Sequence, residues 1–587
     1  MTATARGTPH SSRHAAGEIP RPRIGGQVVL ATVAVNVLSL GLPLVMLHVY
    51  DRIIPNGATA TFGWLILALA VVLLLDAALQ IIRGYFVGWE AARLEHVTSC
   101  RALNHVLESE IDDFERDSPG VHLSRFQAID TLRDYYAGQA RLALVDLPFV
   151  FLFLALIWLI GGAVVIIPVG LLFLLALAAF GLGALLKEAV EDRGTLDSRR
   201  YSFVLEALEG IHTIKLLGME TQMQRRYERL QEQGAVGTYR TVLLGNAVQS
   251  LGVIFSRLTI VIVAGFGGLL VSSDQLTVGG LAACTLLAGR CLQTPLRSLA
   301  LWTQFQKADV ARRKLGQLFH LRREAREDLD EIGEIRGELE LRDLSFGYSG
   351  GKPVLSGLNL KAAAGEMIGI SGKAGCGKST LLMAAMGLLK PTSGQVLFDG
   401  IDTSQRDPHS LRRQIAYLPQ NEVLFQGTIL ENLTLFRGSG SVEVCLSASR
   451  LLGLDLAIHR LPAGFHTRVG DGADSDLPAG VKQTIAMARA LANGARVILF
   501  DEANNALDRN ADEMLKTALA RLKGKVTMVI VSQRPSLLAL ADHVYDLRQG
   551  DLVLRKSRST KTKPRGRPRL KAWKEAPPAN QEKALAS

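Results

Sequence analysis

Forty consecutive uncharged residues, Leu147 to Leu186, constrain this chain more than any other feature of its sequence. A helix of about 20 residues crosses a bilayer core about 30 Å thick, so this run predicts two spans that fold back at Gly161 and Gly162. Four other apolar runs indicate further spans, at Ile24–Leu47, Thr61–Ile82, Leu243–Val271 and Leu276–Leu296. Six transmembrane helices are therefore expected within residues 24–320.

Two long charged segments, 88–141 and 187–242, separate these apolar runs, whereas the other connections are very short, the first of them being the polar loop "YDRIIPNGA". The helices next to the charged segments are expected to extend well beyond the bilayer. The N-terminal arm, residues 1–23, contains four arginines and one glutamate, and the positive-inside rule places such an arm in the cytoplasm. A mitochondrial transit peptide is the alternative for this arm.

Three charged residues, Asp76, Arg257 and Arg290, lie inside the expected spans. A charge at this depth costs at least about 2.5–3.5 kcal/mol, so such residues usually face a cavity or one another. They indicate a polar translocation path, a position near the inner mouth of the spans, or a pair formed by Asp76 and an arginine for packing. The sequence leaves these interpretations open.

The net charge of +11 suggests a nucleic-acid partner, but most of it comes from one segment. Residues 555–587 contain eleven Lys and Arg and two Glu, a net +9, and the rest of the chain is nearly neutral. Pro564–Pro568 resembles the core of an AT-hook, yet attraction to anionic lipid or RNA, or plain disorder, explains this tail better. DNA binding is not expected. The five cysteines have no CxxC spacing, which argues against disulfides or a zinc site.

After a linker at 321–336, residues 337–554 alternate between β-rich and helical patterns and predict an α/β domain. The β-rich runs are "ELELRDLSFGY", "GEMIGISG", "QVLFDG", "ARVILFDE" and "VTMVIVS".

The segment "GKAGCGKST" fits the phosphate-binding pattern G-x-x-x-x-G-K-[ST] and lies between a strand-like run and a helical run. Glycines in such a loop let backbone N–H groups point at phosphate, and the following helix N-terminus favours negative charge. The loop predicts a site for ATP with Mg²⁺, in which Lys378 reaches the β- and γ-phosphates and Ser379 is a metal ligand. A plain glycine-rich turn is the alternative. The nucleotide-binding residues of this loop are Gly372, Gly375, Cys376, Gly377, Lys378, Ser379 and Thr380.

The run "VILFDE" places two carboxylates at the end of an apolar strand. Asp501 is predicted to hold Mg²⁺ and Glu502 to act as the general base toward the attacking water. Gln420, in "AYLPQ", is expected to touch the metal site. Tyr348 is placed to stack on adenine, and its alternative is a core aromatic.

Taken in order, these motifs resemble the nucleotide-binding domain of ABC transporters over residues 337–554. The segments "LPLVMLHVYDRIIPN", "SPGVHLSRFQAIDTLRDYYAGQARLALVDLPF" and "LEALEGIHTIKLLGME" resemble type I secretion exporters. The resemblance implies an α plus α/β fold: a six-helix transmembrane domain of the ABC exporter type, followed by a RecA-like P-loop domain.

The resemblance also implies an inner-membrane protein in contact with membrane lipids, with its nucleotide-binding domain and both termini in the cytoplasm. The implied partners are a second half-transporter, as homodimer or heterodimer, a periplasmic adaptor and an outer-membrane duct. The implied cargo is a protein with a C-terminal secretion signal. The arm at 1–23 is too short for the peptidase-like domain of some relatives, so no processing activity is expected.

Three departures from the family pattern concern ATP hydrolysis. The signature L-S-G-G-Q is replaced by Leu477-Pro478-Ala479-Gly480-Val481, a loop that in the family closes on the γ-phosphate of the partner domain's site. Gln533 stands where the family has a catalytic histidine. Ala503-Asn504-Asn505 replaces Pro-Thr-Ser. Gly480 and Asp508, the latter in the D-loop, are retained and are carried over as nucleotide contacts.

These residues predict intact ATP binding and slow hydrolysis by a homodimer, with Glu502 and Gln533 as the catalytic pair. In a homodimer each ATP site would contain both the replaced signature and Gln533, whereas in a heterodimer each ATP site would contain only one of these two departures. Two alternatives remain open: a regulatory half that binds ATP and hardly hydrolyses it, and a lipid or small-molecule exporter of the same architecture.

Overall fold

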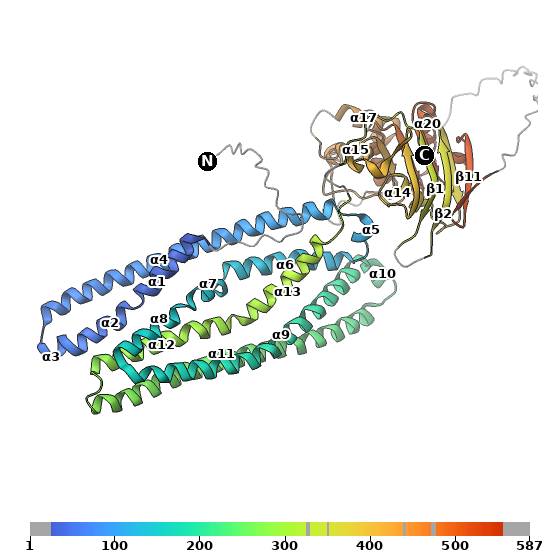
Figure 1. Cartoon of the computed structure of the whole chain (residues 1–587). Coiled ribbons are helices and arrows are strands. Elements are labelled where there is room, and N and C mark those ends of the chain that lie inside the picture. Colours follow the sequence, from blue (N-terminus) through green and yellow to red (C-terminus); the bar gives the residue numbers. More distant parts are fainter. Residues whose placement is uncertain are drawn as a thin grey trace, which may run out of the picture. The chain divides into compact units, whose positions relative to one another are not determined.

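The computed structural model describes residues 25–324, 329–348, 352–437, 442–470, 477–492 and 494–555 (Figure 1). The chain divides into two compact units, 1–326 and 327–587, and the predicted linker at 321–336 spans this division. The N-terminal arm at 1–23, nearly all of the basic tail and the AT-hook-like segment lie outside the described residues.

The first unit is entirely helical in its described residues. Its α-helices are α1 Gly26–Leu38, α2 Gly41–His48, α3 Ile54–Asn56, α4 Thr59–Leu107, α5 Ile111–Phe114, α6 Pro119–Ala137, α7 Gln139–Asp146, α8 Phe149–Gly161, α9 Ile166–Glu209, α10 Ile211–Leu216, α11 Glu220–Ser272, α12 Val278–Ala300 and α13 Trp302–Phe319. Helices α4, α9 and α11 have 49, 44 and 53 residues. At 1.5 Å per residue each is at least about 65 Å long, twice the thickness of a bilayer core, which confirms the expected extensions.

Four stretches of the described residues are long and apolar enough to cross a membrane: Gly26–Asn56, Thr59–Leu107, Phe149–Ala178 and Glu220–Ser272. Their apolar side chains face outward; Leu74 and Ile81 on α4 are 72% and 74% exposed. Such a surface is suited to lipid and not to water. The third and fourth expected spans share one of these stretches. The sixth corresponds to α12, in which Arg290 and Gln293 interrupt the apolar run, so the count of six stays a prediction.

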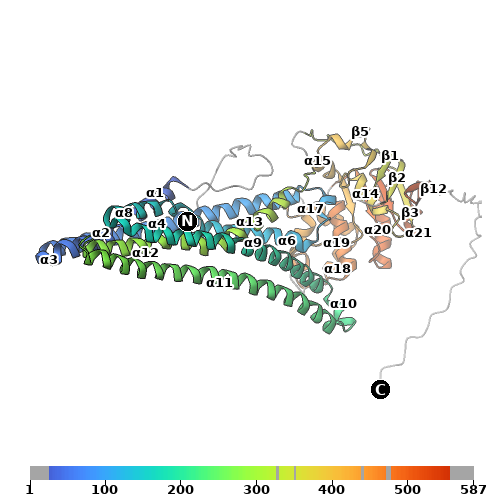
Figure 2. The same ribbon diagram turned by 60° about the horizontal axis from the view of Figure 1, so that its bottom comes forward.

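The chain reverses direction between α8 and α9, where the sequence predicted a fold-back (Figure 1). Gly162 has a φ of +52°, which glycine adopts without steric cost. Gly161 packs so tightly that an added Cβ would lie 2.6 Å from the Sγ of Cys284 on α12. After the reversal, α9 runs beside α11 (Figure 2).

The segment "YDRIIPN" is not the polar loop that the sequence predicted. It continues α2 as a π-helical turn, Val49–Ile53, and then as α3, and the chain turns at Gly57. The Asp51 carboxylate accepts hydrogen bonds from the Thr277 hydroxyl (2.7 Å) and the Gly279 N–H (2.8 Å). Asp51 therefore caps the start of α12, a contact between residues 226 and 228 positions apart that local sequence does not reveal.

The charged residues inside the spans do not form the packing pair considered above. Asp76 accepts a hydrogen bond from Gln80 on its own helix (2.8 Å), and its second oxygen is buried with no hydrogen-bond partner among the residues that the structure describes. Among the described residues, Arg257 and Arg290 are exposed and form no ion pair. Arg257 lines a cavity of about 340 Å³ between α11 and α12, together with Gln249 and Gln293. This arrangement favours the interpretation as a polar path over the packing pair.

The second unit is an α/β domain with two main sheets. Its strands are β1 Leu339–Phe346, β2 Leu355–Ala362, β3 Met367–Gly372, β4 Ser393–Phe398, β5 Ile401–Asp402, β6 Ile415–Leu418, β7 Gly427–Thr428, β8 Arg468–Val469, β9 Val497–Asp501, β10 Thr527–Val531, β11 His543–Arg548 and β12 Asp551–Leu554. Its helices are α14 Lys378–Ala385, α15 Pro408–Arg412, α16 Ile429–Thr434, α17 Val442–Leu451, α18 Leu454–Ile458, α19 Ala479–Leu491, α20 Arg509–Leu522 and α21 Pro535–Leu538. All five predicted β-rich runs form strands.

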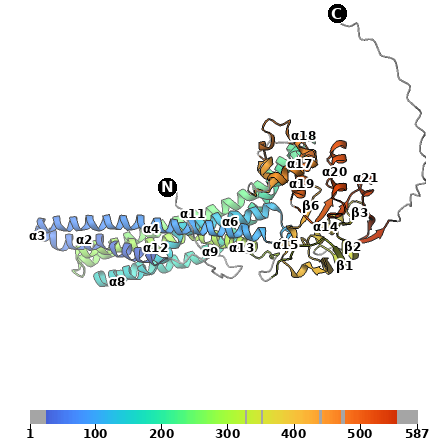
Figure 3. The same cartoon turned by 90° about the horizontal axis from the view of Figure 1, so that it is seen from above.

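The larger sheet, whose strands β3 and β6 are labelled in Figure 3, has the order β12-β11-β3-β10-β9-β6 and is parallel apart from β12. Its central strands β9 and β10 are buried along their whole length, because helices cover both faces of a parallel sheet. In such sheets ligands bind beyond the carboxyl ends of the strands. At that edge, the phosphate-binding loop leaves the end of β3, Asp501 is the last residue of β9, and Gln533 follows β10.

Candidate functional site

A cavity of about 470 Å³ lies at the carboxyl edge of the larger sheet. Ten of the predicted site residues line it: Tyr348, Gly375, Gly377, Lys378, Ser379, Thr380, Gln420, Asp501, Glu502 and Gln533. They come from five segments that the sheet topology brings together. Gly372 and Cys376 belong to the same loop without lining the cavity.

The phosphate-binding loop owes its shape to its glycines. Gly375 and Gly377 have φ angles of +75° and +98°, which only glycine adopts readily. An added Cβ on Gly377 would lie 2.8 Å from Val354, and one on Gly372 would lie 2.7 Å from the Sγ of Cys376. The loop leads directly into α14, which begins at Lys378. The N–H groups of its first turn therefore face the cavity without intrahelical acceptors, as an anion site requires.

Lys378 is almost fully enclosed, with 8% of its side chain exposed. Its ammonium group donates to the carbonyls of Gly372 (3.1 Å) and Lys373 (3.0 Å) and pairs with Glu502 at 3.3 Å. The Glu502 carboxylate thus occupies a position on the ammonium that a phosphate oxygen can take.

Glu502 has a backbone φ of +46°, an unusual conformation for a residue with a side chain. Its carboxylate accepts hydrogen bonds from Gln533 (3.1 Å) and Asn505 (3.4 Å). Burial disfavours the charged form, but these hydrogen bonds and the Lys378 ammonium outweigh burial, so the pKa of Glu502 lies below its ordinary value. Glu502 is therefore ionised near neutral pH, as a base must be to accept a proton.

Asp501 is buried, and burial raises its pKa although the hydroxyls of Ser379 and Tyr417 donate to it. The distance from the Tyr417 hydroxyl to its Oδ2 is 3.1 Å. The Asp501 carboxylate is poorly solvated and lies beside a serine hydroxyl at an open cavity, so the site offers oxygen ligands. Mg²⁺ is commonly held by one or two carboxylates together with substrate phosphates. The residues present therefore fit the ion.

The hydrogen bond from Tyr417 to Asp501, a candidate metal ligand, is a contact that the sequence reasoning missed, although "AYLPQ" contains Tyr417. We expect Tyr417→Phe to weaken ATP binding roughly tenfold when Mg²⁺ is present, because a partner that orients a metal ligand is lost. With EDTA the affinity should be unchanged. Titration of the full chain with a fluorescent ATP analogue measures both. Tyr545→Phe, in the same sheet, is the control; equal losses with and without Mg²⁺ would show that Tyr417 only supports the fold.

Tyr348 is 42% exposed at the rim of the cavity. Its ring packs edge-on against Phe346, and its hydroxyl lies 3.4 Å from the Thr380 hydroxyl. It is thus not the core aromatic considered as the alternative, and its free face is available for stacking. Gln420 is also exposed at the rim.

The replaced signature segment lies apart from this cavity. Pro478 is the N-cap of α19, and its carbonyl accepts from Val481 (2.8 Å). An added Cβ on Gly480 would lie 3.0 Å from the carbonyl of Ala506. Asp508 caps α20 by accepting from the Ala511 N–H at 2.8 Å. Gly480 and Asp508 do not line the cavity of their own domain, so their predicted nucleotide contacts require a partner domain and stay predictions.

The unusual sequence after Glu502 has two structural functions. Asn504 is buried and donates to Asp512 on α20 at 2.9 Å, while Asn505 reaches back to Glu502. The sequence showed that these residues depart from the family pattern but not that one of them, Asn505, touches the Glu502 carboxylate.

Two family models match the chain, one for each unit. Residues 27–296 match the ABC transporter transmembrane region, and residues 355–505 match the ABC transporter domain. Together with the fold and the phosphate-binding cavity, these matches define the class: the chain belongs to the ABC transporters and has the exporter architecture, in which a membrane domain is fused to an ATPase domain.

Its relatives narrow the class further. The chain is 28% identical over 528 residues to the leukotoxin export ATP-binding protein LtxB of Aggregatibacter actinomycetemcomitans, covering 90% of this chain and 74% of the relative. It is equally similar to the toxin RTX-I translocation ATP-binding protein of Actinobacillus pleuropneumoniae. The structure resembles a bacterial Atm1-family ABC exporter with ATP bound, with a TM-score of 0.79, 20% identity and coverage of 90% and 93% of the two chains. That likeness concerns the fold.

Proposed function

We propose that this chain is one half of a dimeric, ATP-driven protein exporter of the type I secretion class in the bacterial inner membrane. The convergence of Lys378, Ser379, Asp501, Glu502 and Gln533 in one cavity, on a chain with membrane-spanning helices, carries the proposal. The relatives named for leukotoxin export and RTX toxin translocation support proteins as the cargo class. A periplasmic adaptor and an outer-membrane duct are the further partners we propose, with the ATPase domain and both termini in the cytoplasm.

Binding of ATP starts with an exchange of partners at Lys378. The ammonium leaves Glu502 and takes phosphate oxygens, while the backbone N–H groups of the loop surround the β-phosphate and Tyr348 stacks on the adenine. Ser379 and Asp501 would hold Mg²⁺, with Gln420 at the rim of the same cavity, and the bound ion would neutralise phosphate charge.

Hydrolysis then uses the carboxylate that Lys378 released. Glu502 orients a water molecule toward the γ-phosphate and accepts its proton, and Gln533 holds the carboxylate in place. Glutamine donates a hydrogen bond but carries no positive charge, so it stabilises the developing phosphate charge less than histidine does. Turnover by a homodimer is therefore slow in this proposal.

The same residues favour a second candidate, an ATP-binding regulatory half of a heterodimer. Pro478 lacks both the hydroxyl and the N–H that the signature serine offers to the partner's nucleotide. A partner with an intact signature would complete the site on this chain, while the degenerate signature would serve only the partner's site.

Deleting the gene and comparing the proteins in the culture medium tests protein export. We expect one or a few proteins to disappear from the medium, and the wild-type gene to restore them. The Lys378→Ala gene should not restore them. An unchanged set of exported proteins, with altered lipids or small molecules instead, would contradict the cargo class and favour the other exporter type.

A further inference from the structure

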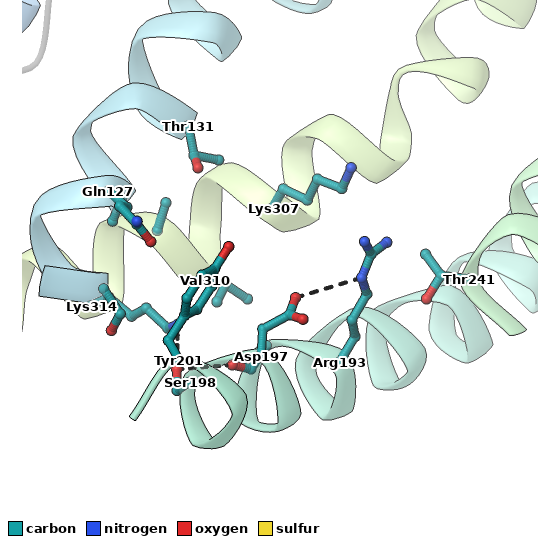
Figure 4. A pocket seen from close by; sticks show the side chains of 14 residues that line it. Gln127, Thr131, Arg193, Asp197, Ser198, Tyr201, Thr241, Lys307, Val310 and Lys314 are labelled. Atoms are coloured by element: carbon teal, nitrogen blue, oxygen red, sulfur yellow. Dashed lines mark hydrogen bonds and ion pairs between the residues drawn. The ribbon is translucent and has the colours of Figure 1, made fainter. Parts of the chain in front are cut away.

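A second polar cavity, of about 250 Å³, lies among α6, α9, α11 and α13 in the helical unit. Helices α6 and α13 lie side by side, as do α9 and α11, and the cavity lies where the two pairs meet. Side chains from all four helices surround it (Figure 4). Its volume is below that of a typical drug-sized pocket, so it fits a small ligand.

The charges around this cavity are mainly positive. Arg193, Lys307 and Lys314 line it, and Asp197 is its only acidic lining residue in the described part of the chain. The Asp197 carboxylate already serves two guanidinium groups, Arg193 at 3.7 Å and Arg200 at 3.3 Å. It therefore does not neutralise the two lysines.

Lys314 illustrates this excess of positive charge. Its ammonium donates to the Ser198 hydroxyl at 3.0 Å and forms no ion pair with any residue that the structure describes. Burial lowers its pKa, and the charge of Asp197 offsets this only in part. An ammonium removed from water without a counter-ion is costly, so an anion beside it would be stabilising.

Neutral donors complete the lining. Gln127 and Thr131 on α6 and Tyr201 on α9 point toward the cavity (Figure 4), and within the described residues their side chains have no hydrogen-bond partner. An amide, two hydroxyls and two ammonium groups thus converge with few acceptors. Lysine ammonium groups with hydroxyls suit phosphate, which accepts bonds from many directions.

We propose that this cavity binds a phosphate group of a small molecule or lipid. Lys307 also borders an adjoining cavity that contains Asp134, but the carboxylate of Asp134 is held by Arg133 at 2.9 Å. Neither Asp197 in the proposed site nor Asp134 in the adjoining cavity is therefore available to neutralise Lys307, so the proposed site keeps its excess of positive charge.

The position of the cavity along the helices decides which phosphate compounds can reach it. Arg193 is seven residues, about 10 Å of helix, beyond Leu186, the end of the uncharged run. Thr241 on α11 lies two residues before the apolar run that starts at Leu243. The cavity therefore begins just beyond the apolar segments at Thr241 and Arg193, and it extends along α13 to Lys307 and Lys314, which lie 11 and 18 residues after Leu296, the end of the last apolar run. Both a lipid headgroup and a soluble phosphate compound can reach this position.

Calorimetric titration of pyrophosphate into the full chain tests the site. The chain carries Lys378→Ala and is held in phosphatidylcholine nanodiscs with EDTA, so that neither the nucleotide cavity nor transport contributes to the measured pyrophosphate binding. We expect saturable binding that Lys307→Gln with Lys314→Gln weakens at least tenfold. Arg313→Gln removes the same charge from the same helix, where Arg313 pairs with Asp309 at 3.2 Å, and should change the affinity less than twofold.

Asp197→Asn provides a test that misfolding cannot imitate. It removes the one acidic side chain of the lining and releases Arg193 and Arg200, so pyrophosphate should bind several-fold more tightly. Nanodiscs with phosphatidic acid distinguish the sources: loss of pyrophosphate binding there identifies a lipid headgroup, and unchanged binding identifies a soluble phosphate. No binding in either disc, or equal affinity in all variants, would overturn the proposal.

Discussion

Lys378→Ala is expected to raise the Kd for ATP about a hundredfold. The ammonium lies in the loop that surrounds the phosphates and is almost enclosed, so no neighbouring cation can replace it. Charge-assisted hydrogen bonds contribute about 1.5–3 kcal/mol each, and loss of one or two of them corresponds to a change of this size. Titration of the purified chain with a fluorescent ATP analogue measures it. Lys361→Ala, which removes an exposed ammonium paired with Glu338 at 2.8 Å, is the matched control.

The ion pair between Lys378 and Glu502 adds a sharper expectation to this experiment. Because Glu502 competes with phosphate for the ammonium, Glu502→Gln should tighten ATP binding several-fold while it abolishes turnover. If Lys378→Ala weakens ATP binding while Glu502→Gln tightens it, phosphate replaces Glu502 as the partner of the Lys378 ammonium. If Lys378→Ala leaves the affinity at the level of Lys361→Ala, the cavity is not the ATP site.

The long apolar stretches and the strands were predictable because the patterns that specify them are local. A charge-free run such as Leu147–Leu186 has one stable environment, and the glycine pair in it supplies the reversal. The strand before Asp501 is a run of apolar residues whose length and carboxylate ending mark a buried parallel strand. Patterns of this kind depend on neighbouring residues, so the sequence contains them in full.

The contacts that sequence reasoning missed join distant residues. Asp51 caps a helix that begins more than 220 positions later, and "YDRIIPN" was therefore mistaken for a loop. Tyr417 meets Asp501 because β6 and β9 are neighbours in the sheet, a pairing that neither strand specifies alone. The polar cavity of the helical unit combines α6 with α13, almost two hundred residues apart. Tertiary packing brings such residues together, and a periodic pattern in the local sequence does not reveal that packing.

The candidate ATP site shows the same division. The loop glycines, Lys378, Asp501 and Glu502 follow from residue types at fixed spacing, and the structure brings them into one cavity. The hydrogen bonds from Asn505 and Gln533 to Glu502 do not follow from spacing, because they depend on the unusual backbone of Glu502 itself. The sequence thus identifies the positions that depart from the motif, and the structure shows which groups the residues at these positions contact.

Repairing two of the three departures from the family pattern, the signature segment and Gln533, is expected to raise ATP turnover strongly. Gln533→His should restore a cationic donor at the γ-phosphate, and a donor of this kind is typically worth about 10²–10³ in rate. Pro478→Ser with Ala479→Gly should restore a hydroxyl and an N–H at the start of α19, where Pro478 now supplies neither. A steady-state ATPase assay of the purified chain in nanodiscs measures each repair and the combination.

The combined repair should exceed the sum of the separate gains in activation free energy, because both act on one phosphate. The histidine is most effective once the signature loop of the partner domain has closed over the site and excluded water. Gln405→His, an exposed position outside the cavity, controls for the added imidazole. Glu502→Gln in the repaired chain should remove the gain and so assign it to this site. Brisk turnover by the unmodified chain alone, also abolished by Glu502→Gln, would contradict the prediction: Lys482 or an adjacent N–H would then already replace the signature serine.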